Sequence, residues 1–426
     1  MKSELKVAIY GDVNANIIDG SAIWLKNIVK LTLCHEQARV WLFLKAPLVR
    51  AQLIADLLDH PRIKVIEPSP TYLNGQAAMT VDSAVSLIES HDDAEHFHAV
   101  ILRGMQLCRR ASDSPGLRGR LWTYITDIPQ SPADVAPADK ENLQAIAAAS
   151  KYVLCQTEEL RSHFSAILDT GRSKLILLPP VVPEGAFYKG DKFAGTGPVK
   201  ILYTGKFAPA WATETLIDVF TELRRDGFDV ELHVAGDKFH RVGNDPAFAD
   251  RLSRKLKETE GLFWYGGLPQ EEVFDLQQSC QIGYGWRDKS LDGSLELSTK
   301  LLEYGASGLG LIANPLRIHR DLLGDRYPLF ASDEKDLKAA LLTALQRPQV
   351  LQEAAYQAAA VAEKFRLESV GENWKTVLNR VFHRPAHGGD SKLRVVLAGH
   401  DLKFSNELIE YFHARPDVEL RIDQWK

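Results

Sequence analysis

One stretch of the sequence decides the fold: Ser298-Thr299-Lys300-Leu301-Leu302-Glu303-Tyr304-Gly305-Ala306-Ser307-Gly308-Leu309-Gly310-Leu311-Ile312-Ala313-Asn314-Pro315. Ser298 or Thr299 can cap the orphan amides at the start of a helix. Gly308 can end that helix, and the apolar run 309–313 is short enough for a buried parallel strand. The pattern therefore predicts a capped helix, a glycine stop and a strand.

Two charged side chains are fixed on this predicted helix. Lys300 lies in the first turn, where the helix dipole disfavours a cation, so its position makes sense if an anion binds at the same end. Glu303 lies one turn along, and its two acceptor oxygens suit a pair of vicinal sugar hydroxyls. A phosphate held at the helix end, beside a ribose held by the acid, is half of a nucleotide-sugar site.

Length and composition set the class of protein. A chain of 426 residues is too long for one ordinary domain, and 45% hydrophobic with 25% charged residues is ordinary for a globular protein. The net charge of −5 argues against a nucleic-acid partner. The start of the sequence does not resemble a signal peptide, and no apolar run is long enough to span a membrane. We expect a cytoplasmic protein.

The cysteines and histidines carry no metal signature. Cys34, Cys108, Cys155 and Cys280 are scattered, and the last two lie in apolar runs, so reduced core thiols are expected. The sequence has no DxD triplet and no histidine pair with metal spacing. No metal and no cofactor are expected.

Short β-rich apolar runs alternate with helical patterns along the chain, which is typical of parallel sheets. Strands are expected at 7–10, 40–44, 65–66, 99–102, 122–126, 152–156 and 175–178, and again at 199–204, 230–235, 262–265, 282–286, 309–313 and 329–330. A proline- and glycine-rich passage separates the two series. The fold class predicted is α/β, with doubly wound Rossmann-like domains at 1–190 and 198–365 facing a cleft. A helix at 366–383 would complete the first domain.

The end of the chain resembles its beginning. After a linker at 384–392, the run Leu393-Arg394-Val395-Val396-Leu397-Ala398-Gly399-His400-Asp401 matches Leu5-Lys6-Val7-Ala8-Ile9-Tyr10-Gly11-Asp12 as a basic-apolar strand leading into glycine and an acid. Residues 393–426 therefore predict the start of a further Rossmann-like module, too small to fold alone. We interpret the chain as a fragment or truncated form of a tandem protein. The alternative is an added βαβ unit packed on the first domain.

Four motifs in order resemble the GT-B glycosyltransferases, in particular the family 4-like group (glycosyl transferases group 1). They are Ile201-Leu202-Tyr203-Thr204-Gly205-Lys206-Phe207-Ala208-Pro209, His233-Val234-Ala235-Gly236-Asp237, Phe263-Trp264-Tyr265-Gly266-Gly267-Leu268-Pro269-Gln270-Glu271-Glu272 and the stretch quoted above. The resemblance implies a GT-B fold and transfer of a sugar from a nucleotide-sugar donor to a glycan or lipid-linked acceptor. It further implies a retaining, metal-independent enzyme of cell-surface polysaccharide biosynthesis.

The resemblance also implies roles for single residues. Glu303 resembles the acid that binds the donor ribose, and Lys206, after Gly205, resembles the basic residue that meets the diphosphate and stabilises the departing nucleotide. Lys300 and the amides near Ser298 and Thr299 resemble the second part of the phosphate site.

In the first domain, Gly20 and Ser21 stand where the family has a glycine loop close to the donor phosphate. Gly20 gives the backbone room to approach a ligand, and Ser21 can cap a helix at 22–33. Asp127 follows a strand that faces the cleft, where such enzymes contact the acceptor or sugar. With Lys206 and Glu303, it completes the catalytic residues that the resemblance implies.

Two positions depart from the family pattern. Trp211 stands where a second basic residue is usual, and Leu295 stands where an acid precedes the ribose acid by eight residues. Glu296 is one residue away from that acid position and would supply it after a shift of register, while Arg287 or Lys289 would replace the missing cation. His240, on a loop after a strand, is a further candidate that would border the nucleotide base.

Two other functions stay open. The departures at Trp211 and Leu295 would suit a catalytically degenerate module acting as a scaffold or glycan binder. A nucleotide-sugar epimerase would need acids and histidines converging on the sugar, and the sequence shows no such set.

A basic cluster adds one expectation about partners. It comprises Arg103, Arg109, Arg110, Arg118 and Arg120, and it predicts either weak peripheral contact with an anionic membrane surface or an ordinary solvated loop.

Overall fold

The computed structural model describes residues 4–17, 20–126, 128–190, 192–193, 195, 197–240, 245–382, 393–399 and 418–424. Its contacts divide the chain into two compact units, Met1–Leu378 and Asn379–Lys426, and each is considered by itself.

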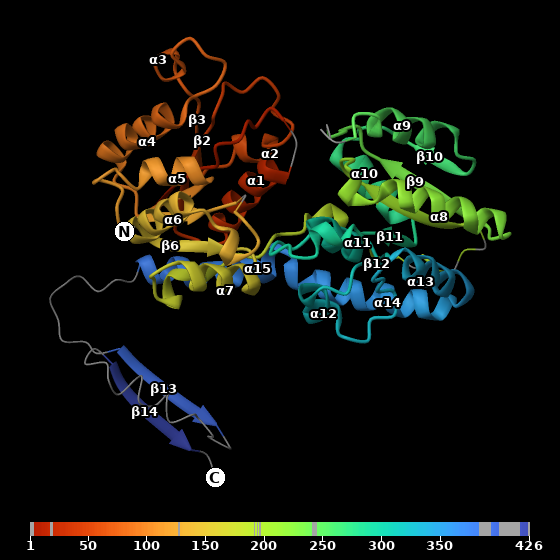
Figure 1. The fold of residues 1–426 in the computed structure, drawn as a ribbon. Helices are drawn as coiled ribbons and strands as arrows, with labels where there is room; N and C mark the ends of the chain where they lie inside the picture. Colours follow the sequence, from red (N-terminus) through yellow and green to blue (C-terminus); the bar gives the residue numbers. More distant parts are fainter. Residues whose placement is uncertain are drawn as a thin grey trace. The chain divides into compact units, whose positions relative to one another are not determined.

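The first sheet has seven parallel strands in the order β3-β2-β1-β4-β5-β6-β7 (Figure 1). The strands are β1 (Leu5–Tyr10), β2 (Ala38–Phe43), β3 (Ile63–Ile66), β4 (Ala99–Arg103), β5 (Leu121–Tyr124), β6 (Ser150–Cys155) and β7 (Leu175–Leu177). They are mostly apolar because a parallel sheet is covered on both faces. The strand order reverses between β1 and β4, which makes this pair the topological switch point where α/β proteins bind ligands.

Helices alternate with these strands, and together they form what we call the first lobe. The helices are α1 (Gly20–Leu33), α2 (Ala55–Leu58), α3 (Pro70–Leu73), α4 (Val81–Glu95), α5 (Met105–Ala111), α6 (Pro137–Ala149) and α7 (Glu158–Ile167), with 3-10 turns η1 (Pro132–Asp134) and η2 (Arg172–Lys174). A further turn, η3 (Glu184–Ala186), follows the last strand of this sheet and packs in the core of the second sheet. Side-chain caps fix two of the starts, since Thr80 accepts from the backbone nitrogen of Ser83 and Thr157 accepts from that of Leu160.

The second sheet is parallel as well, with the order β10-β9-β8-β11-β12. Its strands are β8 (Val199–Thr204), β9 (Val230–Ala235), β10 (Leu262–Trp264), β11 (Ile282–Tyr284) and β12 (Gly310–Ile312). The second lobe is this sheet with α8 (Thr213–Arg225), α9 (Phe248–Glu258), α10 (Gln270–Ser279), α11 (Thr299–Ala306), α12 (Arg317–Leu323), α13 (Glu334–Gln346), α14 (Pro348–Ala362) and the 3-10 turns η4 (Pro209–Trp211), η5 (Lys289–Leu291) and η6 (Glu363–Phe365).

The strand predictions hold with small changes of length. The predicted strands at 199–204 and 230–235 are exact, whereas 282–286 ends two residues early at Tyr284. The strand predicted at 329–330 is reduced to an isolated bridge between Ala313 and Phe330. The prediction of an α/β protein with two Rossmann-like parallel sheets is confirmed.

The decisive stretch folds as its sequence predicts. Helix α11 ends at Ala306, and Gly308 adopts φ +74°, while the Leu309 nitrogen donates back to the Tyr304 carbonyl at 3.0 Å. Strand β12 follows directly. Ser298 stands at the cap position, but its side chain makes no cap hydrogen bond. That hydroxyl therefore does not cap the start of the helix, and the prediction of a side-chain cap from Ser298 is wrong.

Helix α15 (Leu367–Phe382) closes onto the first lobe (blue in Figure 1). The Trp374 ring meets the Trp122 ring of β5 edge to face at 5.2 Å, and the Trp374 indole donates to Thr32 of α1 at 3.4 Å. Both tryptophans are almost wholly buried. The last helix of the unit therefore packs on its first sheet.

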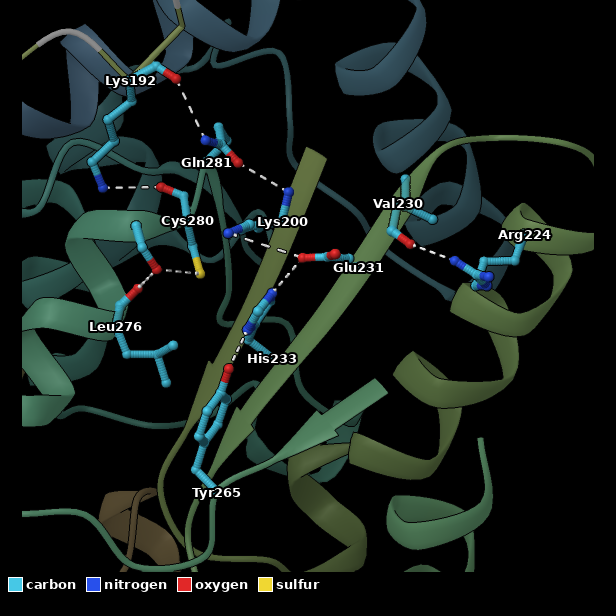
Figure 2. A network of polar contacts seen from close by, with 11 residues as sticks. Lys192, Lys200, Arg224, Val230, Glu231, His233, Tyr265, Leu276, Cys280 and Gln281 are labelled. Atoms are coloured by element: carbon cyan, nitrogen blue, oxygen red, sulfur yellow. Dashed lines mark hydrogen bonds and ion pairs between the residues drawn. The ribbon is translucent and has the colours of Figure 1, made fainter. Parts of the chain in front are cut away.

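The connection between the two sheets is fixed by Lys192. Its Nζ donates to the carbonyl oxygen of Cys280 at 2.9 Å (Figure 2). It also donates to the carbonyl oxygen of Gln277 at 2.7 Å, and burial lowers the pKa of Lys192 to about 7. Nearby, the His233 ring bridges Glu231 and the Tyr265 hydroxyl at 3.0 and 2.8 Å. Lys192, Gln277 and Cys280 are linked near the amino ends of the strands, away from the edge where ligands bind, so we interpret these contacts as structural.

In the second unit, β13 (Leu393–Gly399) pairs in parallel with β14 (Val418–Gln424), with Leu393 opposite Val418. The first two strands of the chain also pair in parallel, with Leu5 opposite Ala38. The tandem interpretation stays a prediction.

Replacing Trp374 by alanine is expected to destabilise the protein by about 3–5 kcal/mol, because it empties a large buried site between α15 and the first sheet. Urea unfolding measures this. Tyr356→Ala, at a side chain that is 61% exposed on α14, is the matched control and should change the midpoint little. Equal effects of the two variants would contradict the packing of α15.

Candidate functional site

Three cations converge at the carboxyl edge of the second sheet. Lys206 follows β8, Arg287 follows β11, and Lys300 lies in the first turn of α11. Burial lowers the pKa of Lys300 to about 7; Glu303 opposes this shift, and the charges of Arg287 and Lys206 contribute to it. Lys206, Arg287 and Lys300 are called the cation cluster below. Such a cluster at one helix end is suited to an anionic ligand.

Aromatic rings hold Lys300 in place. Its Nζ lies 4.1 Å from the ring centroid of Tyr203 and 5.4 Å from that of Trp211 in η4. Trp211 thus supplies a π face to a neighbouring cation at the position where the family pattern has a cation of its own. Gly205 has φ +129°, a conformation that favours glycine, and a Cβ there would lie 3.1 Å from the Lys300 Nζ, so the lysine would have to shift slightly.

Arg287 is a buried guanidinium with unmet donors. It is 5% exposed, and its Nε and Nη2 have no hydrogen-bond partner among the described residues. Burial lowers its pKa, while Asp292 and Glu296 act in the opposite direction. Its backbone is clamped on both sides by Asn314, which accepts from the Arg287 nitrogen at 2.9 Å and donates to its carbonyl at 2.7 Å. Unmet donors on a buried charge are costly, and an anionic ligand would satisfy them.

Glu303 lies one turn after Lys300 on α11. Burial raises the pKa of its carboxyl to about 7, with the Gln277 side chain and Lys300 acting in the opposite direction. Gln277 is itself fixed, because the Ser307 hydroxyl donates to its side-chain oxygen at 2.9 Å. The Glu303 carboxyl, a hydrogen-bond acceptor that changes its charge near pH 7, therefore lies beside the cation cluster.

A narrow cavity runs along the cation cluster. Its volume of about 10 Å³ has room for about one water molecule. Its lining comprises Tyr203, Trp211, Tyr284, Gly285, Trp286, Arg287, Ser298, Lys300 and His319.

His319 was not among the residues predicted from the sequence. It lies on α12 and is 1% exposed, and its Nδ1 donates to the Asn314 carbonyl at 2.7 Å. Burial lowers its pKa to about 4, which keeps the ring neutral at pH 7. Only its spacing of five residues from Asn314, which follows β12, points to it in the sequence.

Leu295 anchors a loop of the second lobe on the first lobe. Its backbone nitrogen donates to the Gln130 side chain at 2.7 Å, and its carbonyl accepts from the Thr157 hydroxyl at 2.6 Å. The Leu297 nitrogen donates to the Gln156 side chain at 2.9 Å. The Leu295 side chain packs against the hydrophobic core of the first sheet. This residue is an apolar anchor in the position where an acid was expected.

Glu296 follows this anchor. Burial raises the pKa of the Tyr124 hydroxyl on β5, and the charge of Glu296 raises that pKa as well. The same charge acts to raise the pKa of Arg287, against the effect of burial. The charge of Glu296 therefore acts on the end of a first-lobe strand and on Arg287, and its role at the expected acid position stays a prediction.

The remaining predicted residues fare differently. Helix α1 begins at Gly20, so Ser21 lies within its first turn and does not cap it. A Cβ at Gly20 would meet no atom within 4 Å, so no protein contact requires glycine there. Asp127 lies outside the described residues. His240 is exposed, and its backbone nitrogen donates to the Phe207 carbonyl at 2.8 Å, which places it beside the loop of Lys206. Thr299 is the first residue of α11.

No group of three or more metal-ligating side chains occurs in the part of the chain that the structure describes. No helix in that part is long and apolar enough to cross a membrane.

Comparison with solved structures gives the fold class. The chain is similar to HepE of Anabaena in complex with UDP and glucose, with a TM-score of 0.64, 14% identity, and coverage of 88% of this chain and 100% of that one. It is similar to sucrose-phosphate synthase of Thermosynechococcus elongatus, with a TM-score of 0.69, 12% identity, and coverage of 89% of this chain and 99% of that one. It is also similar to a glycosyltransferase of Rickettsia africae, with a TM-score of 0.63, 12% identity, and coverage of 90% of this chain and 100% of that one. The chain therefore has the GT-B glycosyltransferase fold.

No protein-family model matches the sequence, and no curated protein matches it either.

Leu295→Glu should lower the stability of the protein by about 1–3 kcal/mol, because it places a charge against the apolar core of the first sheet. Leu295→Met keeps an apolar anchor and should cost under about 1.5 kcal/mol. The melting temperatures of the two variants decide the matter. A glutamate that leaves stability unchanged would show that Leu295 is no anchor.

Proposed function

We propose that this chain is a nucleotide-sugar-dependent glycosyltransferase whose cation cluster holds the donor diphosphate and whose Glu303 holds the donor ribose. The observation that carries the proposal is the buried Arg287 guanidinium, with two unmet donors, beside Lys300. Arg donors match phosphate oxygens in pairs. The GT-B neighbours support it, since one of them, HepE, was crystallised with UDP-glucose.

Charge stabilisation is the chemical work of this site. As the bond between the anomeric carbon and the diphosphate breaks, negative charge grows on the leaving oxygen, and fixed cations in a desolvated site stabilise it. Lys206 is exposed and Lys300 is partly buried, so the cluster reaches from the surface into the protein. Ser298 and Thr299 add the amides at the start of α11. No metal ion is needed for this step.

The finer features of the reaction extend this proposal. The acceptor is a glycan or lipid-linked sugar, the configuration of the sugar is retained, and the enzyme acts in the cytoplasm in cell-surface polysaccharide synthesis, as a member of the family 4-like group. Asp127 is assigned to contact with the acceptor or the transferred sugar, and Glu296 to the acid position that precedes the ribose acid. These features rest on the motif resemblance.

Two observations weaken the alternative of a degenerate scaffold. That alternative rested on Trp211 and Leu295, and both now have a structural reason. Trp211 holds Lys300 through its ring, and Leu295 anchors its loop.

Nucleotide binding is the first test. UDP, GDP or ADP at about 100 times its Kd should stabilise the protein by about 2.7 kcal/mol, which raises the melting temperature by a few degrees. Glu303→Ala should abolish this shift and the slow hydrolysis of the matching nucleotide-sugar. Asp275→Ala, at an exposed acid on α10, is the matched control and should keep both. The proposal fails if none of the three nucleotides shifts the wild type.

The two perturbed pKa values predict how donor affinity depends on pH. Above pH 7, Lys300 loses its proton and its attraction for the diphosphate, while below pH 7 Glu303 gains a proton and loses acceptor capacity for the ribose. Affinity for a nucleotide-sugar, whose diphosphate stays ionised throughout, should therefore peak near pH 7 and fall up to about tenfold per unit on either side.

Calorimetric titration from pH 5.5 to 8.5 measures this profile. Lys300→Met should remove the fall on the alkaline side, and Glu303→Gln the fall on the acid side. Lys335→Met, at an exposed lysine of α13, should leave both. A flat profile in the wild type would contradict the assignment of these two residues.

A further inference from the structure

The basic cluster seen in the sequence resolves into paired and unpaired arginines. Arg109 pairs with Asp113, Arg110 with Asp82 and Arg120 with Asp92, each at 2.6 Å. These three charges are neutralised locally and no longer form a basic surface. Among the described residues, no carboxylate pairs with Arg103.

Arg103 stands at the switch point of the first sheet. It is the last residue of β4, and its guanidinium carbon lies 5.8 Å from the ring centroid of Trp24 on α1, the helix that follows β1. Strands β1 and β4 are the neighbours between which the strand order reverses. Open α/β sheets bind ligands outside the carboxyl ends of such a pair.

The donors of Arg103 are incompletely used. Its Nε is buried and has no hydrogen-bond partner in the described part of the chain. The carboxylate that follows β1, Asp12, is already occupied by Lys45 at 3.0 Å and by the Tyr10 hydroxyl at 3.1 Å. An unmet donor on a charged group is costly, so a ligand acceptor at this position would be strongly favoured.

Two aromatic rings, those of Trp24 and Tyr124, lie next to Arg103. The Trp24 ring lies over the Tyr124 ring at 4.9 Å with 30° between their planes. Tyr124 is the last residue of β5, and after burial the charge of Glu296 is a further cause that raises its pKa. Glu296 also acts on Arg287 of the cation cluster, so the same acid lies near both groups.

We propose that Arg103 and Trp24 form the acceptor subsite, and that the acceptor is a sugar carrying an anionic group, a phosphate or a carboxylate. This proposal rests on the proposed function, since it names the acceptor class of that same site. The sugar packs on the apolar face of the Trp24 ring, and the anionic group takes paired hydrogen bonds from the Arg103 fork.

The test uses matched sugars on the full chain, with the bound nucleotide present. Calorimetric titrations compare glucose with glucose 6-phosphate and glucuronate, and repeat the series with mannose and galactose. At least one anionic sugar should bind about tenfold or more tighter than its neutral parent, as a charge-assisted hydrogen bond predicts. Comparison of the phosphate and carboxylate arms tells which anion is preferred.

Arg103→Met should abolish that preference and leave the Kd for the nucleotide within about twofold, because the variant touches only the acceptor side. Arg103→Lys keeps the charge without the fork and should retain part of the preference, which shows that loss in Arg103→Met is not misfolding. Arg118→Met, at an exposed arginine of the same sequence cluster, should match the wild type.

Two results would overturn the subsite. One is a wild type that binds every anionic sugar no better than its neutral parent while it still binds nucleotide. The other is an Arg103→Met variant that loses nucleotide affinity, which would place the arginine on the donor. Failure of the proposed function would give a different result, because the wild-type protein would then bind none of UDP, GDP and ADP.

Discussion

The proposed donor site depends on Lys300 and Arg287 being held close together in a poorly hydrated place. Like charges in a desolvated place repel each other, and each also loses hydration, so the protein spends folding free energy to hold them there. The structure enforces the arrangement. Tyr203 and Trp211 flank the Lys300 ammonium, and Asn314 holds the Arg287 backbone from both sides. An arrangement that costs stability without a ligand is expected at a binding site.

The same stretch of chain that bears Lys300 also joins the two lobes. The loop before α11 reaches Gln130, Gln156 and Thr157 of the first lobe through its backbone, and Leu295 packs on the first sheet. Because Arg287 precedes this loop and Glu303 follows it, the position of the first lobe and the geometry of the cation cluster are coupled. A ligand that contacts Glu296 would act on both.

The sequence predicted what depends on local pattern. The helix, glycine stop and strand of 298–315, and the strands β8 and β9, follow from spacing and propensity, and they came out as expected. Contacts between residues far apart in the chain could not be predicted from the sequence pattern. Leu295 bonds to Gln130 from 165 positions away, so its role as an anchor could not be seen, and its sequence position suggested only a lost acid.

The arginines show the same limit. A count of charges made Arg110 and Arg120 look like a basic surface, but their partners Asp82 and Asp92 lie 28 positions earlier. Conversely, the unmet donors of Arg287 and Arg103 are visible only once burial is known. The proposed sites depend on hydrogen-bond donors that the fold leaves without a partner, and a sequence pattern does not show which donors have partners.

A crystal structure of the chain with the nucleoside diphosphate that binds it tests the central claim most directly. The account predicts diphosphate oxygens within about 3 Å of the Lys300 Nζ and of the Arg287 Nε and Nη2, and ribose hydroxyls on the Glu303 carboxylate. A nucleotide bound elsewhere, with the Arg287 donors still unpaired, would contradict it.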